Sequence, residues 1–236
     1  MSSTEIAALR PHRDDSNRRM AVPDEFDAEM RVALDQLRSE DVRTQNEGVA
    51  ALIAMGARPV PALLEMLEEE GANQAQIMYA LSKIADPSAA AAFERGLTNA
   101  DESVRAYAAT GLARIGDPRA LAACISTIND AADPLHLDMT PSVSALAEMG
   151  LKATAAMLDL LMSDDLMTRM HGQRALELSV ALRHGFRPGA GFPTPEAEAL
   201  AQAEWKSNGN YEYSSSTAAR AEAVNRWRRW LEAQSA

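Results

Sequence analysis

Residues 101–118 read Asp-Glu-Ser-Val-Arg-Ala-Tyr-Ala-Ala-Thr-Gly-Leu-Ala-Arg-Ile-Gly-Asp-Pro, and this stretch decides the fold. Leu112 stands near the end of a first helix, and Gly116 suits the turn after it, because glycine adopts the left-handed conformation without steric cost. Asp117 and Pro118 suit the start of the next helix, since Asp accepts bonds from free N–H groups and Pro at the first helical position loses none. The stretch therefore predicts a helix, a tight turn and a second helix.

The same pattern returns along the chain, with a leucine near the end of each first helix. Successive leucines are 29, 31, 34 and 30 residues apart, which suits two short helices and two turns per unit. These leucines are Leu52, Leu81, Leu112, Leu146 and Leu176. The second helices align in two columns that we expect to face the core, one made of Leu63, Phe93, Cys124 and Met157 and the other of Leu67, Leu97, Ile128 and Leu161.

The units resemble HEAT repeats, of the short type found in the bacterial phycobilisome-lyase family of HEAT-like proteins. Residues 101–128 carry the resemblance best, and the family's Val-Arg pair stands there as Val104-Arg105. Thr168-Arg169 takes its place in the last unit, and the alignment of the other units rests on leucine and glycine positions. The resemblance covers about residues 40–180 and implies an all-α fold, a right-handed α-solenoid of about five two-helix repeats. It implies a binding scaffold and says little about any activity.

Both ends of the chain depart from the repeat. Gly185 to Pro195 is rich in Gly and Pro and predicts a loop, and a last helix is expected from Thr217 to Gln234. An end repeat has one face without a neighbour, so we expect helices with apolar inner faces, including Trp227 and Trp230, to cap the stack. The predicted parts are a flexible tail, an N-terminal capping helix, the HEAT-like repeats, and a loop with C-terminal capping helices, at residues 1–22, 23–40, 41–184 and 185–236.

The composition argues against several classes of function. A net charge of −11 offers no basic surface for displacing counterions from nucleic acid, so we predict no nucleic-acid partner. Cys124 is the only cysteine, which excludes an intrachain disulfide and fits a reducing compartment. The N-terminus lacks the apolar stretch of a secretory signal, and no apolar run approaches the roughly 18 residues of a membrane span. We therefore expect a cytoplasmic protein without a membrane association.

The sequence contains no pattern that predicts catalysis, a metal or a cofactor. None of its four histidines stands in a His-Glu pair or four residues from another histidine, which excludes a two-histidine metal site on one helix. Cys124 falls in a predicted core column with no His or Asn close in sequence, so a small buried side chain is a better interpretation than a nucleophile. The acidic runs Glu68-Glu69-Glu70 and Asp164-Asp165 lie at junctions between helices, where solvated turns are usual. We predict that the protein is not an enzyme.

A row of polar residues is the candidate partner-binding site. In solenoids of this type the second helix of each unit lines the concave side. A rigid row of polar side chains there can bind a helix or an extended segment of a partner protein, with the acidic members favouring basic groups. The row consists of Glu65, Arg95, Ser126 and Asp159, bordered by Glu69 and Asn129.

Other interpretations stay open from the sequence alone. The row can be a merely solvated face. The repeat type is shared with bilin lyases, so an accessory or lyase-like subunit acting on a cofactor-bearing protein is an alternative that co-purified colour would reveal. A nucleic-acid-binding HEAT solenoid is a further alternative, which needs a concave basic groove with aromatic residues and would be retained on heparin at low salt.

Overall fold

The computed structural model describes residues 24–69 and 71–234, so the predicted N-terminal tail lies outside the described residues. Over these residues the chain forms twelve α-helices, one short 3-10 helix and no strand, which confirms the predicted all-α class. The helices are α1 (Asp24–Leu37), α2 (Val42–Ala54), α3 (Val60–Met66), α4 (Gln74–Ile84), η1 (Pro87–Ala89), α5 (Ala90–Gly96), α6 (Glu102–Arg114), α7 (Ala120–Ser126), α8 (Pro141–Met149), α9 (Leu151–Leu160), α10 (Leu166–Arg183), α11 (Pro195–Ser207) and α12 (Thr217–Gln234).

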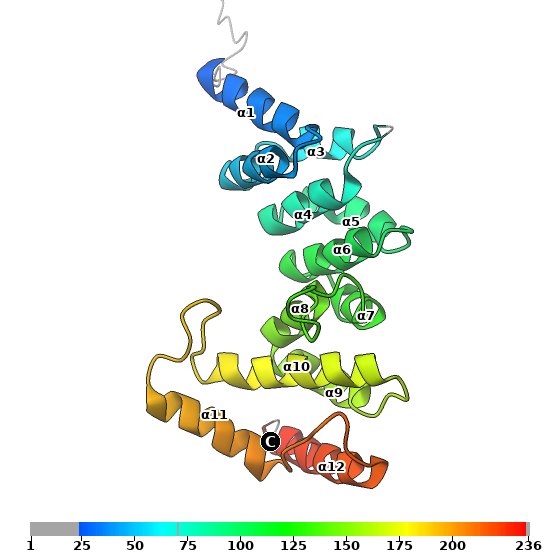
Figure 1. Ribbon diagram of the computed structural model, residues 1–236, viewed down its shortest axis with the longest axis vertical. Helices are drawn as coiled ribbons and strands as arrows, with labels where there is room; N and C mark the ends of the chain where they lie inside the picture. Colours follow the sequence, from blue (N-terminus) through cyan, green and yellow to red (C-terminus); the bar gives the residue numbers. More distant parts are fainter. Residues whose placement is uncertain (1–23, 70, 235–236) are drawn as a thin grey trace, which may run out of the picture.

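The helices are arranged in two rows along the long axis of the molecule (Figure 1). In the first row α2, α4, α6, α8 and α10 each pack against the next member. In the second row α3, α5, α7 and α9 pack against the first-row helices beside them. The buried apolar side chains of neighbouring helices form one core cluster, which runs from Ala33 on α1 to Trp227 on α12.

The predicted core positions are confirmed. The five aligned leucines of the first row are fully buried, and so is the column Leu63, Phe93, Cys124 and Met157 of the second row. In the other second-row column Ile128 and Leu161 are buried, whereas Leu67 and Leu97 are only partly buried. Each helix thus buries an apolar stripe with about one residue per turn, which is the pattern of an amphipathic helix packed on a core.

The turns between paired helices follow from the residues that end each first helix. Gly56 and Gly116 have φ values of 65° and 71°, the left-handed region that glycine enters without steric cost. Ala85 stands at the equivalent place in another unit and adopts φ 56°, although its Cβ makes this conformation unfavourable. The next helix then begins at an acceptor side chain, as Asp86 and Asp117 show by accepting from the backbone N–H of Ser88 and Arg119.

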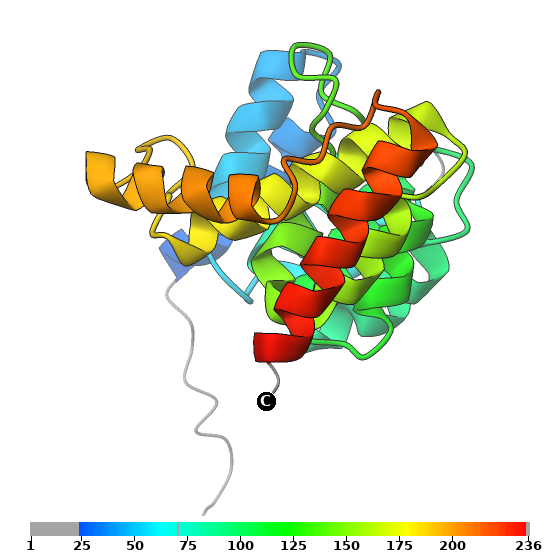
Figure 2. The same cartoon turned by 90° about the horizontal axis from the view of Figure 1, so that it is seen from below.

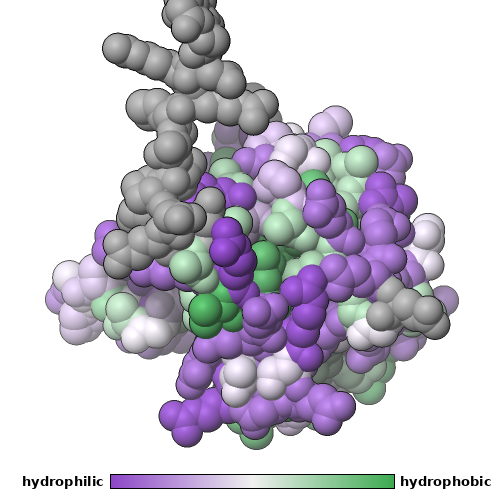
Figure 3. Space-filling view, turned by 90° about the horizontal axis from the view of Figure 1, so that it is seen from above, coloured by the Kyte–Doolittle hydropathy of each residue, from purple (hydrophilic) through white to green (hydrophobic). Residues whose placement is uncertain are grey.

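The two ends of the stack differ. At the N-terminal end α1 packs on α2 through Ala33 and Leu37, which are buried, but leaves Val32 58% exposed. The view onto this end shows hydrophobic atoms at the surface among hydrophilic ones (Figure 3). At the other end α12 packs on α9 and α11 on α10, and α11 extends sideways beyond the stack (Figure 2).

The tryptophans of α12 are buried to different extents. Trp227 is fully buried, and its ring packs against those of Trp205 and Trp230. Trp230 is only partly buried, and the guanidinium carbon of Arg183 lies 4.7 Å from the centroid of its ring. None of the helices in the described part of the chain is both long and apolar enough to cross a bilayer.

Candidate binding surfaces

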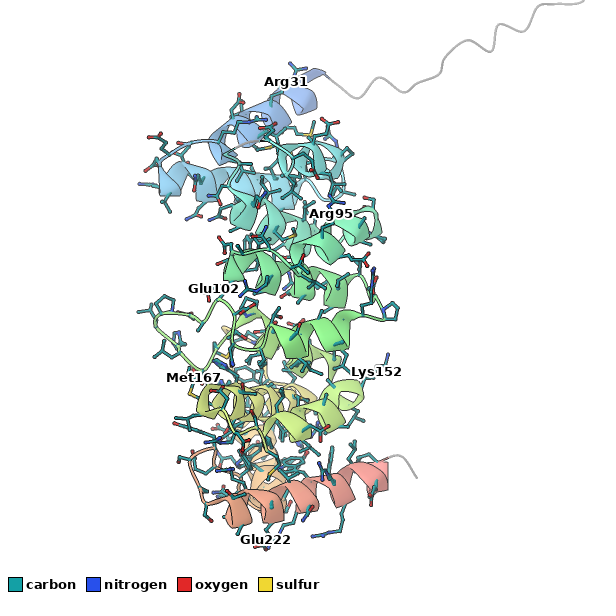
Figure 4. The ribbon with its side chains drawn as sticks, turned by 90° about the vertical axis from the view of Figure 1, so that its right-hand side faces the viewer. Arg31, Arg95, Glu102, Lys152, Met167 and Glu222 are labelled. Atoms are coloured by element: carbon teal, nitrogen blue, oxygen red, sulfur yellow. The ribbon has the colours of Figure 1, made fainter. Side chains whose placement is uncertain are left out.

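The predicted polar row lies on the exposed side of the second row of helices. Glu65 is on α3, Arg95 on α5 and Asp159 on α9, and all three side chains are exposed. Ser126 of α7 is also exposed, although its hydroxyl donates to the carbonyl of Ala123 at 2.8 Å. Figure 4 shows Arg95 on α5 in the view onto this side of the stack. The structure therefore brings the residues of the row onto successive helices, as the repeat register predicts.

Several members of the row form polar contacts within the chain. Arg95 donates to Glu68 at 2.9 Å, and Arg228 of α12 donates to Asp159 at 3.0 Å. Glu69, at the edge of the row, accepts from Arg38 at 2.8 Å in the turn after α1. These ion pairs connect one unit to the next. Exposed ion pairs of this kind contribute about 0–1 kcal/mol each, so a partner can replace them at small cost.

Asn129 has a structural role that the sequence did not predict. Its side-chain amide donates to Thr168 Oγ1 at 2.9 Å, and its Oδ1 lies 2.7 Å from Nδ1 of His171. His171 is fully buried, and its Nε2 lies 2.9 Å from the carbonyl oxygen of Leu137. Asn129 and His171 thus hold the loop between α7 and α8 against α10.

That loop projects from the side of the stack. In Figure 4 it lies between the labelled residues Glu102 and Met167. Leu135 and Leu137 at its tip are 87% and 60% exposed. The leucine spacing of 34 residues across this unit reflects the extra residues of the loop.

A cleft on the first row of helices is a second candidate, which the sequence interpretation did not include. It lies between α4, α6 and α8 and has a volume of about 150 Å³. The rings of Tyr79 and Tyr107 meet edge to face in it, with centroids 5.1 Å apart. Lys83 lies above Tyr79, with its Nζ 5.2 Å from the ring centroid. The other polar side chains of the lining are Ser82, Thr110, Arg114, Ser144 and Glu148.

The cleft contains two basic side chains, Lys83 and Arg114, and one carboxylate, that of Glu148. Partial burial lowers the pKa of Lys83, and the nearby Arg114 lowers it further, whereas Glu148 acts in the opposite direction. Arg114 donates to the carbonyl of Ser82 at 3.2 Å. Within the described part of the chain neither Lys83 nor Arg114 forms an ion pair with a carboxylate. Burial also raises the pKa of Tyr107, so its phenol stays protonated and can donate a hydrogen bond at neutral pH.

A larger groove of about 550 Å³ lies beside the cleft, toward the loop between α7 and α8. Tyr107, Pro141 and Ser144 line both hollows, which are therefore neighbours. Glu102 and Asp133 give the far groove an acidic edge. The cleft thus carries Lys83, Arg114 and Glu148, and the groove beside it carries Glu102 and Asp133.

The sequence contained a signal for the cleft. Lys83, Arg114 and Glu148 each follow the aligned leucine of their unit by two residues. Tyr79, Thr110 and Ser144 each precede it by two residues, and all six line the cleft. Side chains at such positions lie one helical turn apart on a shared face, so successive units place them side by side.

Chemistry by a nucleophile or a metal has little support among the described residues. Burial raises the pKa of the Cys124 thiol to about 12, so the thiol stays protonated at neutral pH. No group of three or more His, Cys, Asp or Glu side chains in the described part of the chain is arranged to hold a metal ion. A comparison with known protein families finds no family model that matches the chain, and no curated protein matches it.

Proposed function

We propose that this chain is a right-handed α-solenoid of about five HEAT-like two-helix repeats that acts as a non-catalytic scaffold for a partner protein. The observation that carries the proposal is the polar row on the second row of helices. Its side chains come from four successive helices at equivalent places and are exposed. A stack with one continuous core keeps such side chains at fixed separations, which lowers the entropy lost on binding.

The chemistry of the row favours a partner with basic groups. Glu65 forms no hydrogen bond or ion pair with any described residue, so its carboxylate is free to bind. Among the described residues Asp159 pairs with one exposed arginine, Arg228, which a basic group of the partner can displace. The single buried cysteine agrees with a reducing cytoplasm, which we propose as the location.

Affinity capture from the native cell tests the proposal. The variant Glu65→Lys, Asp159→Lys reverses two charges of the row on exposed side chains and should keep the helical circular dichroism spectrum of the wild type. It should lose the partner. The control Glu196→Lys, Glu232→Lys makes the same change of charge at exposed positions of α11 and α12 and should retain it. Equal recovery of the partner by both folded variants would refute the row as the binding surface.

A further inference from the structure

The cleft between α4, α6 and α8 has two properties that the polar row lacks. Its basic groups have no carboxylate partner among the described residues, in a chain whose net charge is −11. It is also a concave site with a volume of about 150 Å³, walled by two tyrosine rings.

We propose that the cleft binds the carboxylate side chain of an Asp or Glu residue in the partner protein, with Lys83 and Arg114 as its ion-pair donors. This inference rests on the proposed scaffold function and names the chemistry of the partner at a second surface. The cleft is large enough, because a cavity of about 150 Å³ holds a benzene-sized group and a carboxylate side chain is smaller. Ser144 and the phenol of Tyr107 line the same cleft and add hydrogen-bond donors.

The neighbouring charges decide between one carboxylate and a polyanion. Glu148 closes one end of the cleft, and Glu102 and Asp133 line the adjoining groove. Nucleic acid binds through many phosphates and needs an extended basic surface, which these three carboxylates interrupt. A single acidic side chain in the cleft has only one of them, Glu148, in the same hollow. A basic residue of the same partner segment would face Glu102 and Asp133, because the two hollows are adjacent.

The state of Lys83 agrees with this assignment. Its pKa is lowered by partial loss of water and by Arg114, so its charged form is less well stabilised than in solution. A carboxylate beside it would reverse this effect and would form a charge-assisted hydrogen bond, which is stronger than a neutral one. An acidic side chain that enters the cleft would thus add a second carboxylate near Lys83, beside that of Glu148.

Selection from a random peptide library displayed on phage tests the inference without knowledge of the natural partner. The immobilised full-length wild type should enrich peptides that share an acidic residue, with a basic residue further along. A synthetic enriched peptide should bind the variant Lys83→Glu, Arg114→Glu at least about tenfold more weakly, the usual consequence of losing a hydrogen bond to a charged group. With the immobilised variant Lys83→Glu, Arg114→Glu as the target, selection should enrich peptides that carry a basic residue in place of the acidic one.

The control variant Lys152→Glu, Arg187→Glu carries the same change of net charge on exposed side chains of α9 and of the loop before α11, and should bind the peptide as the wild type does. Equal weakening by the control would overturn the inference, because it would show general charge attraction. Enriched peptides without an acidic consensus, or peptides affected only by Glu65→Lys, Asp159→Lys, would overturn the inference and leave the scaffold function standing. Failure to enrich any peptide would count against both.

Discussion

Gly111→Ala on α6 tests how closely α5 and α6 pack in the core. A Cβ at Gly111 would lie 2.4, 2.5 and 2.6 Å from three ring carbons of Phe93, which is fully buried on α5. Overpacking of this kind costs about 1–3 kcal/mol. Replacing glycine by alanine inside a helix stabilises the folded protein by about 1 kcal/mol, because alanine restricts the unfolded chain. We therefore expect the free energy of unfolding to fall by about 0–2 kcal/mol.

A double-mutant cycle isolates the clash from the change in helix propensity. Phe93→Leu alone should lower the free energy of unfolding by about 1–2 kcal/mol. This is less than the cost of Phe93→Ala, because leucine leaves a smaller cavity. In the double variant Gly111→Ala, Phe93→Leu the new methyl group meets no ring, so the two losses should not add. The favourable coupling should be about 1–3 kcal/mol, from urea unfolding of all four proteins followed by circular dichroism. Additivity within about 0.5 kcal/mol would show that the Phe93 ring does not exclude a side chain at Gly111.

Three further predictions concern a turn, the C-terminal cap and one carboxylate. Ala85→Gly should raise the free energy of unfolding by about 1 kcal/mol, because Ala85 holds a left-handed φ of 56° that is unfavourable for alanine; an unchanged or lower value in urea would contradict this. Trp227→Ala should cost about 3–5 kcal/mol, as expected for a fully buried ring. Trp230→Ala should cost clearly less, and equal losses of Tm would refute the packing described for the cap. Arg119 lowers the pKa of Asp117 from 3.8 to about 2. Because the pKa of Asp117 is lower in the folded than in the unfolded chain, its carboxylate stabilises the fold above about pH 4. This stabilisation is lost as the pH falls toward about 2 and the carboxylate becomes protonated. The difference in Tm between the wild type and Asp117→Asn should therefore shrink over that range, and a constant difference would contradict the prediction.

The stack could be predicted because its signals are local. A leucine near the end of each first helix, a glycine in the turn and an acceptor before the next helix all lie within about one unit of sequence. The burial of a side chain that depends on contacts between distant helices could not be predicted in the same way. Trp230 follows the same apolar stripe as Trp227, yet it is only partly buried and contacts the guanidinium of Arg183, a residue of α10 far away in the sequence.

The loop between α7 and α8 shows a second limit. The 34-residue spacing predicts extra residues in this unit but not their conformation. The loop is fixed by His171, which lies on α10 and contacts both Asn129 and Leu137. No pattern in the sequence connects these positions, because the contact spans more than one unit. Asn129 was consequently assigned to the partner-binding row, whereas its amide also holds this loop.

The two candidate surfaces make different contributions to recognition. A basic group that binds the polar row at Asp159 must displace Arg228, and one that binds at Glu69 must displace Arg38. Each such exchange replaces one exposed ion pair by another and gains little free energy. A carboxylate that enters the cleft displaces no described carboxylate from Lys83, although it loses its own hydration and meets Glu148. If both proposals hold, we expect Lys83→Glu, Arg114→Glu to weaken binding of the partner more than Glu65→Lys, Asp159→Lys, because only the row has ion pairs that the partner must displace.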